Sequence, residues 1–226
     1  MKCHPNTDTT DDPDAAWTPG KQPPKVLVIS GSIRPESYTR SLSFNIRDRL
    51  SALGAHVDHW DAATPMLPMA DPSYHRTASE YPDHVVVHLD HLARNADAFV
   101  MATPVYHNSF SGVLKNLLDL LNVQHHFQMK PVGLVSHGGD RTSQAVDQLR
   151  IVARGLNLVA IPTQVCTKAA DFDGTSGQRD VISRDIAERI DRFAAELLSF
   201  TVLLAPLRVP GAAEQITSLL SPASTS

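Results

Sequence analysis

Cysteine, aromatic residues and long apolar runs are all scarce in this chain, and each scarcity excludes a class of protein. Its 226 residues contain two cysteines, Cys3 and Cys166, too few for a disulfide framework. No apolar run reaches membrane-spanning length, and residues 1–24 lack the apolar core of a signal peptide. The formal net charge of −4 offers no basic patch for nucleic acid or an anionic membrane. We therefore expect a cytoplasmic protein with neither kind of partner.

The two commonest phosphate-binding motifs are missing as well. There is no Gly-Lys-Ser/Thr of a Walker A loop, and no set of three spaced glycines of a dinucleotide fingerprint. Instead, the stretch SGSIRPESYTR at residues 30–40 joins an apolar run to a segment with helical apolar spacing. Its backbone N–H groups, hydroxyls and arginine before a helix N-terminus favour binding of a phosphate monoester. The alternative is an ordinary strand-to-helix turn rich in serine and glycine.

Apolar and amphipathic segments alternate along the rest of the chain. Strands are predicted at residues 26–30, 55–60, 98–103, 131–136 and 156–161, and helices at residues 39–53, 82–95, 112–122, 142–155 and 178–204. Strands that are apolar on both faces and separated by helices indicate a parallel sheet covered on both sides. We therefore predict an α/β, flavodoxin-like three-layer sandwich with a five-stranded parallel sheet over residues 25–204. Residues 1–24 are predicted to be a flexible arm and residues 205–226 a flexible tail.

Two more loops follow predicted strands and should lie at the same edge of the sheet. Residues 103–112 begin with a rigid Thr-Pro and carry Tyr106, which suits the edge and face of a flat heterocycle. Residues 136–141 contain paired glycines, which allow a ligand to approach the backbone closely. Each loop has a simpler interpretation: Tyr106 packs on the core, and the paired glycines form a tight turn capped by Asp140 or Thr142.

Four blocks together carry a family resemblance. Residues 31–39, 103–107, 111–119 and 136–139 resemble those of the NAD(P)H-dependent FMN reductases of the flavodoxin-like superfamily, and the similarity extends from about residue 25 to residue 200. The resemblance implies hydride transfer from NADPH or NADH to FMN and on to a small-molecule electron acceptor. It also implies a homodimer or homotetramer.

The same resemblance implies which residues bind FMN. The phosphate would contact Ser32, Arg34, Ser37 and Thr39; the isoalloxazine would be lined by Pro104, Val105, Tyr106 and His107 and bordered on its far side by Gly138 and Gly139; Tyr38 and Ser136 complete the cofactor-binding set. No residue is assigned as a catalytic acid or base, because flavin chemistry requires the protein mainly to hold and expose the ring.

The second loop departs from the family pattern and leaves the acceptor open. It reads Pro-Val-Tyr-His where many relatives have Pro-Glu-Tyr-Asn. Free flavin, a quinone, or an azo or nitro compound are all candidate acceptors. The alternative is a dedicated FMN-containing dehydrogenase or oxidase of one metabolite. An electron carrier of the flavodoxin type is disfavoured, because the chain is only mildly acidic and has 6% aromatic residues.

The number of histidines suggests a metal site, but their arrangement does not. His84, His88 and His91 share one helical face, but zinc sites usually draw ligands from more than one element. We therefore expect a solvent-facing stripe and no metal site. The pair His125 and His126 follows a predicted helix, where a cation would suit the negative end of the helix dipole.

Overall fold

The computed structural model describes residues 22–174 and 178–208. A parallel sheet with strand order β2-β1-β3-β4-β5 forms its centre, and β6 also pairs with β4. The strands are β1 (Lys25–Ser30), β2 (His56–Asp61), β3 (Ala98–Pro104), β4 (Pro131–His137), β5 (Val159–Ala160) and β6 (Val165–Thr167), and the α-helices are α1 (Tyr38–Ala52), α2 (His84–Asn95), α3 (Gly112–Asp119), α4 (Gln144–Gly155) and α5 (Arg184–Leu204). The predicted α/β fold with a parallel sheet is confirmed.

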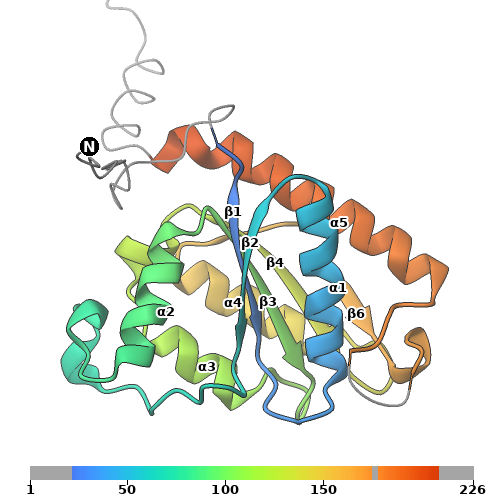
Figure 1. Ribbon diagram of the computed structural model, residues 1–226, viewed down its shortest axis with the longest axis horizontal. Coiled ribbons are helices and arrows are strands. Elements are labelled where there is room, and N and C mark those ends of the chain that lie inside the picture. The colour runs from blue at the N-terminus through green and yellow to red at the C-terminus, as the bar shows by residue number, and fades with distance from the viewer. Residues whose placement is uncertain (1–21, 175–177, 209–226) are drawn as a thin grey trace, which may run out of the picture.

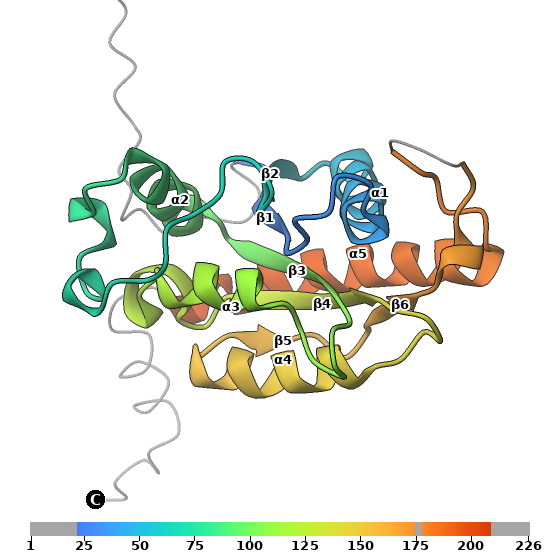
Figure 2. The same ribbon diagram turned by 90° about the horizontal axis from the view of Figure 1, so that it is seen from below.

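The two faces of the sheet bury different side chains, as strand alternation requires. Leu27 and Ile29 of β1 join the core formed with α2, α3 and α4. Val26 and Val28 point the other way and pack with residues of α1 and α5. Figures 1 and 2 show α1 and α5 close together, apart from α2 and α3. Because both faces are covered, the central strands are apolar throughout, which is the pattern that made them recognisable.

The prediction of a single fifth strand at residues 156–161 is wrong in its bounds. The structure divides this position of the sheet into β5 and β6, both paired with β4. Pro162 lies in the break and has no N–H to offer. The Arg150 guanidinium donates to the Pro162 carbonyl (3.1 Å), and Glu196 accepts from the Thr163 amide (3.1 Å). Side chains from α4 and α5 thus satisfy the backbone that leaves the sheet.

Several helix ends also differ from prediction. Helix α4 begins at Gln144 after Ser143, so neither Asp140 nor Thr142 is its N-cap. Helix α5 begins only at Arg184, and α3 ends at Asp119 before a π-helical turn over Val123–Phe127.

Most of the predicted arm and tail lies outside the described residues. Of the tail, Ala205–Arg208 continues from α5 as a short 3₁₀ helix, and Arg208 donates to the Asp97 carbonyl (2.8 Å).

The strand order places the candidate loops together. From β1 the chain runs to β2 on one side, and from β2 it crosses back to β3 on the other side of β1. Such a reversal of direction predicts a crevice beyond the carboxyl ends of β1 and β3. The loops after β1, β3 and β4 all emerge at this edge, which lies at the bottom of Figure 1.

Candidate functional site

The loop between β1 and α1 begins in a space that only glycine fits. The Gly31 amide donates to the Ala102 carbonyl (2.8 Å), and the Ser111 hydroxyl donates to the Gly31 carbonyl (2.6 Å). A Cβ on Gly31 would lie 2.9 Å from Cβ of Leu114 and 3.0 Å from the Ala102 oxygen. This close packing against β3 and α3 sets the direction in which the loop leaves the sheet.

Hydroxyl groups gather where this loop enters α1. Ser32 and Thr39 are 1% exposed, and the Ser37 hydroxyl caps α1 by accepting from the Arg40 amide (3.2 Å). A capping hydroxyl that accepts one bond can still donate its own hydrogen to an anion. Ser30 is fully buried at the end of β1, and its hydroxyl has no hydrogen-bond partner among the described residues. Together with the first amides of α1, these donors form a cradle suited to phosphate.

The two arginines of the loop have different roles. Arg34 is exposed, and its Cζ lies 5.6 Å from the centroid of the Tyr106 ring, so it spans the first and second loops. Arg40 instead pairs with Asp61 (2.5 Å) and donates to the Pro35 carbonyl (2.6 Å). Arg40 therefore holds the loop in shape, which leaves Arg34 as the arginine available to a ligand in this loop.

The loop after β3 is a rigid tight turn. Tyr106 and Ser109 exchange two backbone hydrogen bonds (2.8 and 2.9 Å) around His107 and Asn108, whose φ angles are +49° and +64°. Two positive φ angles in succession are typical of a type I′ turn. The Val105 amide donates to the His137 carbonyl (2.9 Å), so pairing with β4 continues one residue beyond Pro104.

The turn is supported from outside. The Gln148 side chain of α4 accepts from the Ser109 hydroxyl (2.5 Å) and donates to the Asn108 carbonyl (2.8 Å). These two bonds hold the tip, where His107 lies, against the body of the protein.

The loop after β4 touches the second loop directly. The Gly138 amide donates to the Thr167 carbonyl (2.9 Å), and a Cβ on Gly138 would lie 2.8 Å from Cγ2 of Val105. Ser136 is buried, and its hydroxyl donates to the Thr142 carbonyl (3.3 Å). A Cβ on Gly139, by contrast, would meet no atom of the described residues within 4 Å. The glycines thus allow one close contact and leave one open edge.

The Arg141 side chain forms ion pairs within the protein. Its guanidinium binds Asp171 through two nitrogens and Asp185 through a third contact (2.9 Å). These carboxylates raise the pKa of Arg141 above its usual value. Its positive charge is therefore matched by residues of the neighbouring loop and α5.

An aromatic stack joins the first and third loops. The Tyr38 and His137 rings lie 4.6 Å apart at 14°, and Arg179 places its Cζ 4.4 Å from the Tyr38 centroid. Burial lowers the pKa of His137 to about 4, and the nearby charges of Arg179 and Arg34 act in the same direction. The ring is therefore neutral near pH 7. Sequence analysis missed Arg179, because no local pattern connects it to the loops.

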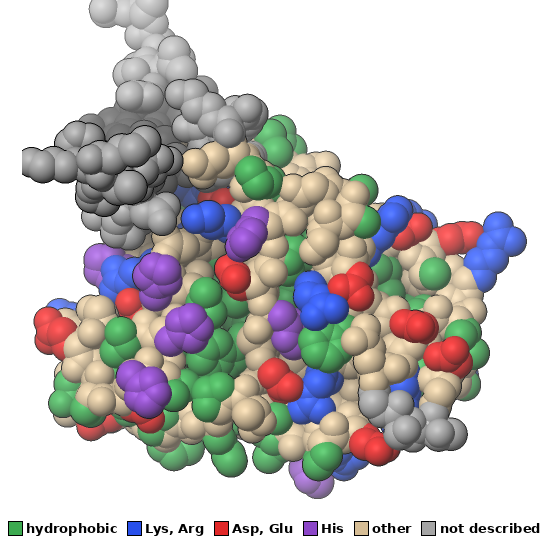
Figure 3. Space-filling view, viewed as in Figure 1, with side chains coloured by type: hydrophobic (Ala, Val, Ile, Leu, Met, Phe, Trp, Pro, Cys, Tyr) green, Lys and Arg blue, Asp and Glu red, His purple; other side chains and the backbone are tan. Residues whose placement is uncertain are grey.

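The histidine stripe does not form a cluster. His84, His88 and His91 are exposed on α2, and Figure 3 shows histidines scattered over this part of the surface. Within residues 22–174 and 178–208, no three His, Cys, Asp or Glu side chains are grouped as metal ligands. The one described cysteine, Cys166, is partly buried, and burial raises the pKa of its thiol. These properties are typical of a small residue that packs at the edge of the core.

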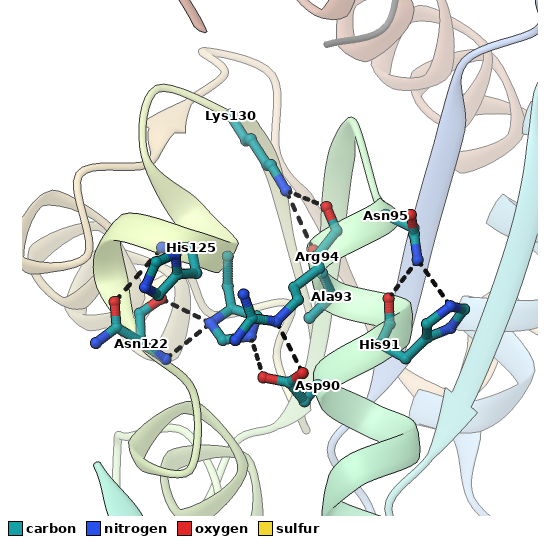
Figure 4. A network of polar contacts seen from close by, with 9 residues as sticks. Asp90, His91, Ala93, Arg94, Asn95, Asn122, His125 and Lys130 are labelled. Atoms are coloured by element: carbon teal, nitrogen blue, oxygen red, sulfur yellow. Dashed lines mark hydrogen bonds and ion pairs between the residues drawn. The ribbon is translucent and has the colours of Figure 1, made fainter. Parts of the chain in front are cut away.

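His126 belongs to a buried polar network in the π-helical turn that follows α3. It is fully buried; its Nε2 lies 2.8 Å from an Asp90 oxygen, and its Nδ1 lies 2.8 Å from the Asn122 amide. The other Asp90 oxygen accepts from Arg94 (2.8 Å). Figure 4 shows Asp90 and Arg94 extending from α2 toward the turn that carries Asn122. This network joins α2 to the π-helical turn.

The parallel sheet and the order of its strands define the class of this protein as flavodoxin-like. Two solved structures are similar: an NADH:FMN oxidoreductase in its apo form, with 21% identity, TM-score 0.62, and coverage of 87% of this chain and 99% of that one, and FerB, an NAD(P)H:acceptor oxidoreductase from Paracoccus denitrificans, with 17% identity, TM-score 0.64, and coverage of 80% and 98%. At these identities the similarity establishes the fold alone.

The family follows from the sequence comparison. The model of the NADPH-dependent FMN reductases matches residues 24–171, and the chain belongs to that family. It is 34% identical over 178 residues to an FMN-dependent NADPH-azoreductase of Staphylococcus saprophyticus, covering 78% of this chain and 94% of the relative, and 32% identical to one of Staphylococcus aureus with the same coverage. The predicted class, an oxidoreductase that uses FMN and a nicotinamide, is confirmed. None of the described helices combines the length and apolar character needed to cross a membrane.

Proposed function

We propose that this chain holds FMN at the carboxyl edge of its sheet and passes hydride from NADPH to an azo compound. Three loops lie at one edge of the sheet, after β1, β3 and β4, and buried hydroxyls lie at the start of α1; this arrangement is the observation that carries the assignment of the site. The azoreductases that it resembles over 78% of its length support the choice of acceptor.

The residues present fit the cofactor. The unpartnered Ser30 hydroxyl and the buried Ser32 and Thr39 offer donors that the fold itself does not use up. With Ser37 and the first amides of α1 they would bind the phosphate, and Arg34 would add a charge-assisted contact. Tyr38 and Ser136 would support this set from the adjacent loops.

The second and third loops would hold the ring. When bound, FMN supplies the ring that accepts hydride and passes it on. Pro104 and Val105 form a stiff wall, and Tyr106 and His107 present side chains and donors at the tip of the turn. Gly138 would keep the third loop close to Val105, and Gly139 would leave space on the far side of the ring.

We propose that the protein is a homodimer or homotetramer and is cytoplasmic. Met66 and Met69 are 63% and 80% exposed on the segment after β2, and a partner subunit would cover such apolar side chains. Light scattering at micromolar concentration tests the assembly, and a monomer would contradict it.

The central experiment is an anaerobic absorption spectrum of the purified protein with FMN. We expect NADPH to bleach the flavin band faster than NADH does, and an azo dye to restore it while losing its own colour. A flavin that neither nicotinamide reduces would instead indicate a dehydrogenase or oxidase of one metabolite. A quinone reduced far faster than the dye would contradict the proposed acceptor, and a protein that does not bind FMN would refute the site.

A further inference from the structure

Arg179 is a buried cation beside the proposed phosphate cradle. Its side chain is 4% exposed and lies against the Tyr38 ring. Its backbone is fastened to the first turns of α1, because its amide donates to the Ser41 hydroxyl (3.2 Å) and its carbonyl accepts from Asn45 (2.9 Å). Its Nη2 lies 3.3 Å from a carboxylate oxygen of Glu36, which belongs to the loop between β1 and α1.

This position is electrostatically unusual for a cation. The N-terminus of a helix carries partial positive charge, so a buried guanidinium beside the first turns of α1 is repelled by the dipole. The side chain of Glu36 is 57% exposed, so it has room to turn away from Arg179 when a ligand binds. Arg34 adds a second positive charge to the same region. The N-terminus of α1 and two arginines together favour an anion at this place.

We propose that Arg179 is a second arginine of the phosphate site, which positions the 5′-phosphate of FMN with Tyr38, and that Glu36 is the counter-ion it exchanges for the phosphate. The inference rests on the proposed function and adds a residue distant in sequence to that site. The ligand chemistry is a phosphate monoester, which the 2′-phosphate of NADPH shares. We assign the FMN phosphate because Arg179 is anchored to α1, the helix whose N-terminus forms the cradle.

The test compares FMN with riboflavin, which lacks the phosphate. Apo-protein is titrated with each flavin by fluorescence quenching, for the parent and for Arg179→Gln, Arg179→Lys and Glu36→Gln. Arg49→Gln is the matched control. Arg49 also forms an ion pair, with Asp191 (2.6 Å), but it lies in the last turn of α1, at the opposite end from the proposed phosphate site. Circular dichroism and thermal melting confirm that each variant folds.

We expect Arg179→Gln to weaken FMN binding roughly 10- to 100-fold and riboflavin binding less than about twofold. Arg179→Lys should keep part of the selectivity for FMN over riboflavin, because lysine retains the positive charge but cannot stack a planar guanidinium on the Tyr38 ring. Glu36→Gln should tighten FMN binding about threefold or more, because it removes the competing carboxylate. Glu36 is exposed, so this variant tests the proposal even if the Arg179 variants do not fold. The control should match the parent.

Three results would overturn the inference while leaving the proposed function intact. The first is an equal loss of affinity for FMN and for riboflavin. The second is a ratio of FMN affinity to riboflavin affinity that does not change in the Arg179 variants or in the Glu36 variant. The third is a change only in the ratio of the KM values for NADPH and NADH. The last result would assign Arg179 to the nicotinamide donor. A parent protein that binds neither flavin would refute the flavin site itself.

Discussion

Replacing Gly138 by alanine should disturb the flavin site through a single contact. The added Cβ would lie 2.8 Å from Cγ2 and 3.0 Å from Cβ of Val105, whereas carbon atoms pack at about 3.5 to 4.0 Å. Val105 cannot move aside by rotating, because Cβ does not move with χ1 and β-branched side chains are stiff. Its backbone is also held by the hydrogen bond to the His137 carbonyl (2.9 Å). The two loops must therefore separate.

The expected cost follows from this overlap. Overpacking of a tight contact typically costs about 1 to 3 kcal/mol, and we expect the free energy of unfolding of Gly138→Ala to fall by that amount. Because the loop after β3 moves, FMN affinity should fall about tenfold. Urea denaturation of the apo-protein and titration with FMN measure the two effects separately.

A second substitution and a control test whether the contact with Val105 causes the loss of stability. Val105→Ala, added to Gly138→Ala, removes the nearest atom and should recover at least half of the lost stability. Gly155→Ala is the control, because no atom elsewhere in the described residues lies within 4 Å of its added Cβ and alanine is the better helix residue. If Gly138→Ala is as stable as the parent and binds FMN equally well, or if the second substitution recovers nothing, the contact does not control the loops.

Two further predictions concern stability. Asp90→Asn should lower the free energy of unfolding by about 3 to 5 kcal/mol in urea denaturation, because it leaves buried His126 and Arg94 without their carboxylate; a variant as stable as the parent would contradict the network. Stability should also fall as the pH is lowered from 6.5 toward 4, because burial holds the pKa of His59 and His137 at about 4 and only the unfolded chain takes up protons in that window. His59→Asn should reduce this slope, and a flat profile for the parent between these pH values would show that the two rings are not buried neutral.

The sequence by itself determined the architecture and brought the loops of the proposed site to one edge of the sheet. Apolar runs such as residues 26–30, separated by amphipathic segments, are a local signal, and a local signal suffices when strands are buried on both faces. Parallel strands bring their carboxyl ends to one edge, so the loops at residues 30–40, 103–112 and 136–141 could be placed together without coordinates.

Only the tertiary structure decided which side chains these loops meet. The divided fifth strand depends on Arg150 and Glu196, which reach it from two helices, and the burial of His126 depends on Asp90 from another helix. Arg179 meets Tyr38 only because its backbone is fastened to α1. Such contacts join residues far apart in the chain, and packing rather than local periodicity selects them, so no pattern along the sequence records them.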